Sequence, residues 1–538
     1  MPTILQRGAN DWSFMTEPQK YSSFGLNEKI QFLPRGKGLG GSGQMNYMLH
    51  GMGLPLDFDK WAEMGALGWD YSNIEPIMKK IFISDETPQE SSLFPTKSAP
   101  VIRLSDIDKK LDYITTNFLK ATKQLPKNVK LDVNTFRYTI SNGHRESSFK
   151  SHLLPNLNRI NLHVLKNCLV TKVRKLEICN KFICHLQWSF SSWESYFQVI
   201  FNGKDAEAIE IQNNEHLIRV FAFKEIILSS GSLKTPQLLM LSGIGPKNEL
   251  KKLAINPIFY SEEVGKNLHD HLNMPLYVSI NEPITMTLNK ITNLDSVFSY
   301  FLKGKGFIAS PGVLALGRGQ NDSAIILFAM GSVDEVILRE IANFKSEVFH
   351  SFFPFYKDSN KEGFIFLNTC LQPSSRGTVK LRDTDPTQPP IIDPNYLSNI
   401  QDIECMIRAI RLSIEVSNTP TFRKLGAILH WPLLDGCIHL WDEMNITDDY
   451  LECIIRFGAL TGHHAAGTCS MAGESAVVDP SLLVKGVRKL SIVDASILPT
   501  PVSSPPNSVI VVVAERAAQI IKIRHNIQPA TCTSKVPF

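Results

Sequence analysis

Apolar residues recur with two different periods along this chain, and each period predicts a different kind of element. The run 219–230 ends in three apolar residues, 226–228, and is followed at once by Gly231, which is typical of a strand, a glycine turn and a helix. A further strand is predicted over 162–176. Units of this kind build doubly wound parallel sheets, so we expect an α/β fold in this part of the chain.

The middle of the chain follows a different pattern. Between about residues 271 and 447, short β-rich runs such as 363–367 and 377–381 alternate with turns, and the stretch 400–418 has the period of a long helix. Helical periodicity is also present over 59–83. We therefore expect a second, α+β domain that is built on an antiparallel sheet and covers the first.

Both domains are expected to be discontinuous, because the pattern of the first domain returns near Leu451. A chain of 538 residues is long enough for two or three ordinary domains. The expected first domain comprises 1–60, 156–270 and 451–525, the second comprises 61–155 and 271–450, and 526–538 form a tail.

The C-terminal part predicts a strand, a loop and a helix in succession. The run 490–493 is β-rich, and the four prolines between 499 and 506 exclude a helix in the loop. Asn507 is a good N-cap for a helix over 508–522. The N-terminus of a helix is electropositive, so a group that faces Asn507 is expected to be anionic or to become so.

Three blocks of residues resemble those of the glucose-methanol-choline (GMC) flavoprotein oxidoreductases. The C-terminal block is His464-Ala465-Ala466-Gly467-Thr468-Cys469, followed by Asp494-Ala495-Ser496 and Asn507. The other two are the glycine-rich loop 36–46, which looks like the flavin-cradling loop, and the run 231–246. Residues 38–51 most resemble arthropod glucose-dehydrogenase-like members, including those of the "neither inactivation nor afterpotential G" type.

The resemblance implies FAD as the cofactor and oxidation of an alcohol as the reaction. It implies that His464 is the catalytic base and that Asn507 holds the same substrate oxygen. The implied cofactor contacts are Gly40, Gly41, Ser42 and Asn46 at the flavin, Val170 at the adenine, and Asp494 and Ala495 near the ribityl and pyrophosphate groups. Glycines at such positions allow the backbone to approach the ring closely, although a tight turn without a ligand is the alternative.

The chemistry of alcohol oxidation suits these residue types. A base must lie within hydrogen-bond reach of the hydroxyl while the carbinol carbon lies over the flavin ring. A histidine has a near-neutral reference pKa, which suits His464 to that task, although a structural histidine is the alternative. His463 is expected to be structural or, secondarily, a pocket residue. For Asn507, a cap without a catalytic role is the alternative.

We expect the chain to lack the N-terminal unit with which GMC proteins hold the ADP part of FAD. That unit is a strand, a Gly-x-Gly-x-x-Gly turn and a helix. Gly36-x-Gly38-x-x-Gly41 has the spacing, but the run 33–35 interrupts any strand before it, so we do not interpret it as a dinucleotide fingerprint. The alternatives to an active enzyme are therefore a cofactor-free relic or an incomplete gene model, at most a ligand-binding protein. Residues 1–538 alone are expected to be insoluble or colourless.

Composition and charge exclude several other classes. The chain is 43% hydrophobic and 20% charged, and its net charge of +4 is dispersed, which argues against a nucleic-acid partner. No apolar run approaches the roughly 18 residues of a transmembrane segment. The resemblance implies a sugar, retinoid or sterol-like alcohol as the substrate and a quinone or O2 as the electron acceptor. No leader is visible over 1–23, and the compartment stays open.

The nine cysteines carry no metal-binding pattern. Cys179 and Cys184 lie close together, but no second pair accompanies them, so free thiols are expected there and no metal site. Cys469 is expected to serve packing. The sequons at Asn321 and Asn445 would matter only in a secreted protein.

Overall fold

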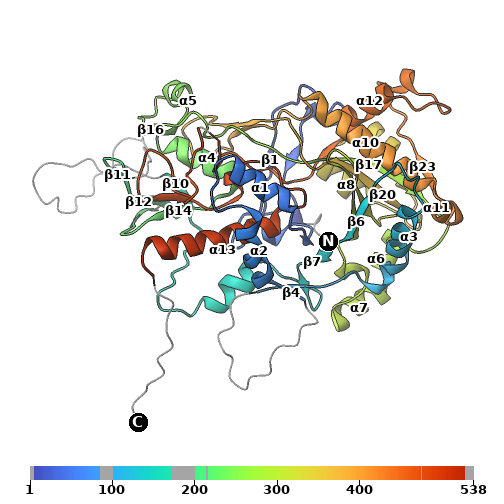
Figure 1. Ribbon diagram of the computed structural model, residues 1–538, viewed down its shortest axis with the longest axis horizontal. Helices are drawn as coiled ribbons and strands as arrows, with labels where there is room; N and C mark the ends of the chain where they lie inside the picture. The colour runs from blue at the N-terminus through green and yellow to red at the C-terminus, as the bar shows by residue number, and fades with distance from the viewer. Residues whose placement is uncertain (1–4, 85–100, 173–199, 214–215, 474, 528–538) are drawn as a thin grey trace, which may run out of the picture.

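The computed structural model describes residues 5–84, 101–172, 200–213, 216–473 and 475–527. Its described helices are α1 (Pro55–Glu63), α2 (Tyr71–Ile81), α3 (Asp112–Thr122), α4 (Gly231–Leu241), α5 (Lys247–Lys252), α6 (Leu288–Thr292), α7 (Leu294–Lys303), α8 (Glu335–Ala342), α9 (Ser346–Phe352), α10 (Ile400–Ser417), α11 (Pro420–Lys424), α12 (Asp448–Gly458) and α13 (Asn507–Arg524). Figure 1 shows α4 and α13 in one half of the molecule and α3, α10 and α12 in the other.

The half that contains α4 and α13 combines a parallel pair of strands with an antiparallel sheet. The parallel pair is β14 (Ile226–Leu228) with β25 (Leu490–Ile492). Each strand ends close to a helix, because β14 leads directly into α4 and β25 leads through a proline-rich loop into α13. The antiparallel sheet consists of β10 (Leu169–Lys172), β12 (Asp205–Asn213), β11 (Ile200–Asn202) and β13 (His216–Phe221).

The other half is built on a sheet of seven antiparallel strands (Figure 1). Its order is β23 (Ile428–His430), β17 (Leu272–Ser279), β20 (Gly363–Cys370), β19 (Ser323–Phe328), β18 (Val313–Arg318) and β6 (Asp132–Thr135), and β24 (Leu460–Thr461) also pairs with β17. Successive side chains of β20 point to opposite faces, so Phe364 and Phe366 pack with Phe118 of α3 while Ile365 packs with Ile454 of α12. Both faces of the sheet are therefore covered, and the central strands β17 and β20 are almost wholly buried.

The remaining strands are short pairs at the edges of these two halves. They are β1 (Phe14–Met15) with β2 (Phe32–Leu33), β3 (Leu49–His50) with β7 (Arg137–Tyr138), β4 (Phe82–Ser84) with β5 (Ile102–Leu104), β8 (Ile140–Ser141) with β9 (His144–Arg145), β15 (Ile244–Gly245) with β16 (Phe259–Tyr260), and β21 (Thr378–Lys380) with β22 (Ile391–Asp393). Several of their side chains are buried, such as Ile102, Tyr138 and Ile244, so these pairs also contribute to the packing.

Helices α1 and α2 pack in the core of the α4 and α13 half. Trp61 and Ile77 are buried there with Leu228, Ile492 and Val512. We expected residue 61 to begin the second domain, but the packing continues across that position because α1 packs on α2 and α2 packs on α13. The division into two domains itself stays a prediction.

Two disulfides hold the seven-stranded half among the described residues. Cys370 at the end of β20 is bonded to Cys405 of α10, and Cys437 is bonded to Cys453 of α12. The sequence predicted neither pair, because cysteine spacing alone does not identify partners. Cys469 is a fully buried free thiol, as packing requires, whereas Cys179 and Cys184 lie outside the described residues.

Several predicted elements are present with different bounds. The helix expected over 400–418 is α10, and the strand over 363–367 extends to Cys370 as β20. The helix expected over 59–83 is interrupted between α1 and α2, where Gly65 and Gly68 have φ angles of +106° and +83°, which a helix does not allow. The strand expected over 219–230 is divided into β13 and β14. Of 162–176, the described part forms a strand only over β10.

Two further expectations are corrected. A doubly wound parallel sheet was expected, but in the described residues the parallel pairs β14 with β25, β15 with β16 and β4 with β5 are three separate two-stranded sheets. Asn507 was expected to cap α13. It is instead the first helical residue, and Pro506 before it has φ −79° and ψ −9° and offers no side-chain cap. A cap residue needs extended backbone, which Pro506 does not have.

Candidate active site

A cavity of about 890 Å³ lies in the half that contains α4 and α13. This volume is in the range of cofactor and ligand sites, about 300–1,000 Å³. Its wall comes from the loop 35–43, from β10, from the β14–α4 loop, from the segment 463–465, from the residues after β25 and from the first turns of α13. The carboxyl ends of both parallel strands therefore face the cavity, which is where α/β sheets commonly bind ligands.

The glycine-rich loop exposes its backbone to this cavity. Gly38 and Gly41 have φ angles of +135° and +51°, and a Cβ atom added at either would meet no atom within 4 Å. Gly40 has φ +90° and packs against Phe149. The Gly36 amide donates to the Ser42 hydroxyl over 3.1 Å, which closes the loop. The open space at two glycines is a cradle that side chains would fill, so the loop fits a bound planar cofactor.

Asp494 fastens the end of β25 to the start of α4. Its Oδ2 accepts hydrogen bonds from the Gly231 amide at 2.8 Å and from the Thr235 hydroxyl at 2.6 Å, and its Oδ1 accepts from the Ser496 amide at 2.8 Å. Asp494 and Ala495 both line the cavity. Because the carboxylate is occupied by three protein donors, Asp494 shapes the wall rather than offering a free charge.

His464 is half-buried in the cavity wall, and its ring is held from behind. Its Nδ1 lies 2.8 Å from Nδ1 of His271, and the two rings are nearly perpendicular at 85°. Its Nε2 makes no hydrogen bond among the described residues. Burial lowers the pKa of His464 well below its usual value, and His271, His463 and Arg35 lower it further. The ring is therefore neutral at pH 7.

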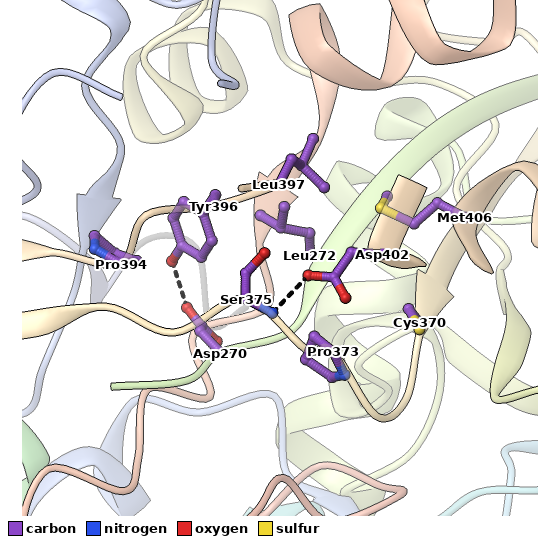
Figure 2. Close-up of a pocket in the computed structure, with 10 residues that line it drawn as sticks. All are labelled: Asp270, Leu272, Cys370, Pro373, Ser375, Pro394, Tyr396, Leu397, Asp402 and Met406. Carbon is purple, nitrogen blue, oxygen red and sulfur yellow. Dashed lines mark hydrogen bonds between the residues drawn. The ribbon is translucent and has the colours of Figure 1, made fainter. Parts of the chain in front are cut away.

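Asp270 anchors the backbone of His464 from below the cavity. Its Oδ1 accepts from the His464 amide at 2.7 Å, and its Oδ2 accepts from the hydroxyls of Tyr396 and Thr461, each at 2.6 Å. Figure 2 shows the Tyr396 hydroxyl directed at Asp270, and both residues line a small cavity of about 20 Å³. Three hydrogen bonds to one buried carboxylate make the position of His464 rigid, since each charge-assisted bond contributes about 1.5–3 kcal/mol.

Two further charged or titratable residues line the same wall. His463 has a left-handed backbone, φ 62°, and burial lowers its pKa to about 4. Its Nδ1 has no partner among the described residues, which agrees with a pocket position. Burial also lowers the pKa of Arg35, whose Nη2 is unpartnered in the described part of the chain.

Asn507 lies at the first turn of α13 and lines the cavity. Its Oδ1 is 3.8 Å from a Cβ built at Gly43, so the amide lies beside the glycine loop. The amide makes no hydrogen bond within the described ranges. A free amide is therefore available to a ligand.

The loop before Asn507 is held by α1. Asp57 accepts from the amide and the hydroxyl of Ser503, each at 2.8 Å. The indole of Trp61 donates to the Thr500 hydroxyl at 2.9 Å. These bonds explain why a loop with four prolines still delivers Asn507 to a defined place.

The cavity brings together eight of the nine predicted site residues. They are His464, Asn507, Gly40, Gly41, Ser42, Val170, Asp494 and Ala495. Asn46 is the exception, because its Oδ1 accepts from the guanidinium of Arg145 and from the Met48 amide, and it supports the loop from outside the wall. No group of three metal-ligating side chains occurs in the described residues, and none of their helices is long and apolar enough to cross a membrane.

Sequence reasoning missed the residues behind the wall. Asp270 and His271 were given no role in the sequence analysis, and Arg35, which lines the wall itself, was regarded only as part of the run 33–35 that interrupts a strand. The usable signal was the position of Asp270 and His271 directly before the apolar run that forms β17. Two polar residues at the mouth of a buried strand require partners.

The chain is similar to known proteins over most of its length. Family models described as GMC oxidoreductase match residues 13–273 and 373–514. "Neither inactivation nor afterpotential protein G" of Drosophila melanogaster is 35% identical over 97% of this chain and 83% of its own length. "Glucose dehydrogenase [FAD, quinone]" of Drosophila pseudoobscura pseudoobscura is 28% identical over 95% of this chain and 78% of its own. A formate oxidase structure is similar in fold, with a TM-score of 0.77, 23% identity, and coverage of 98% of this chain and 90% of its own.

Proposed function

Since the chain belongs to the GMC oxidoreductase family, we propose that it oxidises the CH–OH group of a small-molecule alcohol to a carbonyl, with His464 as the base. The observation that carries the proposal is that an unpartnered imidazole nitrogen, a free amide and an open glycine loop line one cavity. FAD is the cofactor. When bound, it takes up the two electrons and the hydrogen that leave the carbinol carbon.

Different residues of the cavity wall would contact different parts of FAD. Gly40, Gly41 and Ser42 would hold the flavin against the glycine loop, with Asn46 supporting that loop from behind. Val170 would contact the adenine, and Asp494 with Ala495 would adjoin the ribityl and pyrophosphate groups. Open space at glycines favours this arrangement over a cofactor-free relic, in which side chains would be free to fill the space.

Two side chains act on the substrate oxygen. His464 is neutral, so Nε2 accepts the hydroxyl proton while the C–H bond breaks and the C=O bond forms. The Asn507 amide donates a hydrogen bond to the same substrate oxygen while that oxygen loses its proton. The N-terminus of α13 stabilises negative charge next to Asn507, and the buried surroundings strengthen that effect.

The substrate class and the electron acceptor belong to the proposal as well. We propose a sugar, a retinoid or a sterol-like alcohol as the donor, and a quinone or O2 as the acceptor. The similarity to "Glucose dehydrogenase [FAD, quinone]" of Drosophila pseudoobscura pseudoobscura supports the sugar and the quinone. We also propose two domains. The FAD-binding domain comprises 1–60, 156–270 and 451–525, and the substrate-binding domain comprises 61–155 and 271–450, except that α1 and α2 pack in the core of the α4 and α13 half.

The test is the rate at which an alcohol bleaches the flavin absorbance of the FAD-loaded protein under anaerobic conditions. His464→Ala is expected to lower that rate by roughly two to four orders of magnitude, the usual size of a general-base contribution, without changing the spectrum of the bound flavin. His463→Ala is the matched control and is expected to lower it much less. A His464→Ala protein that is reduced at the wild-type rate would remove His464 from the mechanism.

A further inference from the structure

We propose that His271 is a positioning residue that sets the tautomer of His464, so that Nε2 of His464 carries no proton and faces the cavity as an acceptor. The proposal rests on the proposed function of His464 as the base. It follows from the hydrogen bonds behind the cavity wall, which leave one arrangement of protons for two neutral rings.

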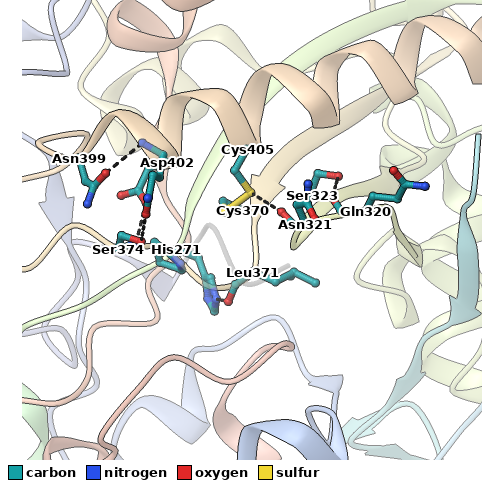
Figure 3. Close-up of a disulfide and its surroundings, with 12 residues drawn as sticks. His271, Gln320, Asn321, Ser323, Cys370, Leu371, Ser374, Asn399, Asp402 and Cys405 are labelled. Carbon is teal, nitrogen blue, oxygen red and sulfur yellow. Dashed lines mark hydrogen bonds between the residues drawn. A yellow bond between two sulfur atoms is a disulfide. The ribbon is translucent and has the colours of Figure 1, made fainter. Parts of the chain in front are cut away.

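The first step is the hydrogen bond between His271 and a backbone carbonyl. His271 Nε2 lies 2.9 Å from the oxygen of Leu371, and a carbonyl oxygen can only accept. His271 Nε2 therefore carries the proton. Figure 3 shows the His271 ring beside Leu371, next to the Cys370–Cys405 disulfide.

The second step is the contact between the two rings. A neutral imidazole has one N–H, so Nδ1 of His271 is an acceptor once Nε2 donates to Leu371. The 2.8 Å contact then requires that Nδ1 of His464 carries the proton. His464 is left with a lone pair on Nε2, which is the form that a base needs.

The third step concerns the charge of the pair. Burial lowers the pKa of both His271 and His464, so both rings stay neutral at pH 7. The groups that face His271 are Asp270 and Asp57, which favour its charged form, and those that face His464 are His463 and Arg35, which oppose it. A charged His271 would donate from both nitrogens and would reverse the tautomer of His464. The assignment therefore applies to the neutral pair, which is the form present at pH 7.

The carbonyl of Leu371, which accepts the hydrogen bond of His271 Nε2, is held rigidly. Leu371 follows Cys370 at the end of β20, and its amide donates to the carbonyl of Asp322 at 2.8 Å. Cys370 is bonded to Cys405 of α10. His271 itself directly precedes β17, which pairs with β20. The position of the acceptor is thus fixed by the sheet and by a covalent link.

The direct test is the ¹⁵N spectrum of the FAD-loaded protein with ring-labelled histidine, because protonated and unprotonated ring nitrogens resonate in separate regions. The His464 signals are identified by their loss in His464→Gln. An unprotonated Nε2 in the wild-type protein is the expected result. A protonated Nε2 would overturn the proposal even if the enzyme were active, and the tautomer can be measured even if no alcohol is oxidised.

Two substitutions of His271 separate positioning from packing. His271→Leu fills the space but cannot accept from His464 Nδ1, and we expect flavin reduction to slow by up to roughly 10⁴-fold, as when a base loses its orienting acceptor. His271→Asn keeps an acceptor oxygen, and we expect it to restore most of the rate and the wild-type tautomer. Equal loss in both variants, or no loss in either, would reject the proposal.

The matched control is His430→Leu. His430 lies in β23 opposite Tyr277, towards the other end of β17, and its Nε2 lies 2.8 Å from the Ser279 hydroxyl. The same substitution there removes a hydrogen bond from the same sheet without touching His464. We expect the His464 tautomer and the rate of flavin reduction to stay at wild-type values in this variant, and a loss of rate equal to that of His271→Leu would overturn the proposal.

Discussion

Replacing Cys370 and Cys405 together by alanine tests the stability of the seven-stranded half and its link to the active site. The disulfide closes a loop of 35 residues between β20 and α10. In the chain-entropy account, loss of such a crosslink costs about 4 kcal/mol, because the unfolded chain regains the freedom that the loop denied it. Alanine is the replacement because it adds no polar group at these two buried positions.

The matched control is the pair Cys437→Ala and Cys453→Ala. That disulfide closes a loop of 16 residues, for which the same account gives about 3 kcal/mol. Urea unfolding, followed by tryptophan fluorescence, measures both costs. We expect both double variants to unfold at lower urea, with the larger shift for the pair from β20 and α10.

The two double variants should differ more clearly in activity. Cys370 precedes Leu371, whose carbonyl accepts the hydrogen bond of His271, whereas Cys437 and Cys453 lie away from that contact. Flavin reduction should therefore slow in the first variant and stay close to the wild-type rate in the control. An unchanged urea midpoint in the first variant would refute the loop-closure reasoning. Equal slowing in both variants would refute the link to His271.

Two further predictions concern Asn507 and His463. Asn507→Ala should slow flavin reduction, which stopped-flow absorbance measures. It should lower the unfolding free energy, measured by urea unfolding, by less than the value of a helix cap, about 1 kcal/mol, because Asn507 makes no cap bond. A decrease of about 1 kcal/mol or more in the unfolding free energy would contradict this prediction. The pKa of His463 falls from 6.5 to about 4 on folding. Between these pH values the unfolded chain therefore binds more protons than the folded chain. The stability that His463 contributes is complete above pH 6.5 and is lost as the pH falls towards 4. His463→Asn should therefore reduce the slope of unfolding free energy against pH in that window by up to about 1.4 kcal/mol per unit, and an unchanged slope would show that His463 is not buried in its neutral form.

Local sequence predicted the elements whose cause is local. The helix α10 and the strand β25 follow from periodicity over a few turns, and Gly231 marks the junction of β14 and α4 because that turn needs its φ of +81°. The residues of the cavity wall were found for a related reason, since the glycine loop and the segment around His464 each have a distinctive run of residue types.

The contacts behind the wall could not be predicted, because each joins segments far apart in the chain. His271 and His464 are 193 residues apart, and Asp270 meets Tyr396 across 126. No local pattern identifies such partners. Asn507 illustrates the opposite failure, in which a strong local preference for capping was overridden by the helical backbone of Pro506.

The cavity wall is built from segments that lie far apart along the chain. His50, close to the glycine loop, meets Ser508 of α13 through a contact of 2.9 Å that spans 458 residues. Contacts of such separation form late in folding, because the entropy of closing the intervening loop must be lost first. The cavity wall that would hold FAD is therefore complete only after the two ends of the chain have met, so flavin absorbance of the purified protein would report native topology. A library of variants could be screened for native topology by absorbance alone, without any substrate.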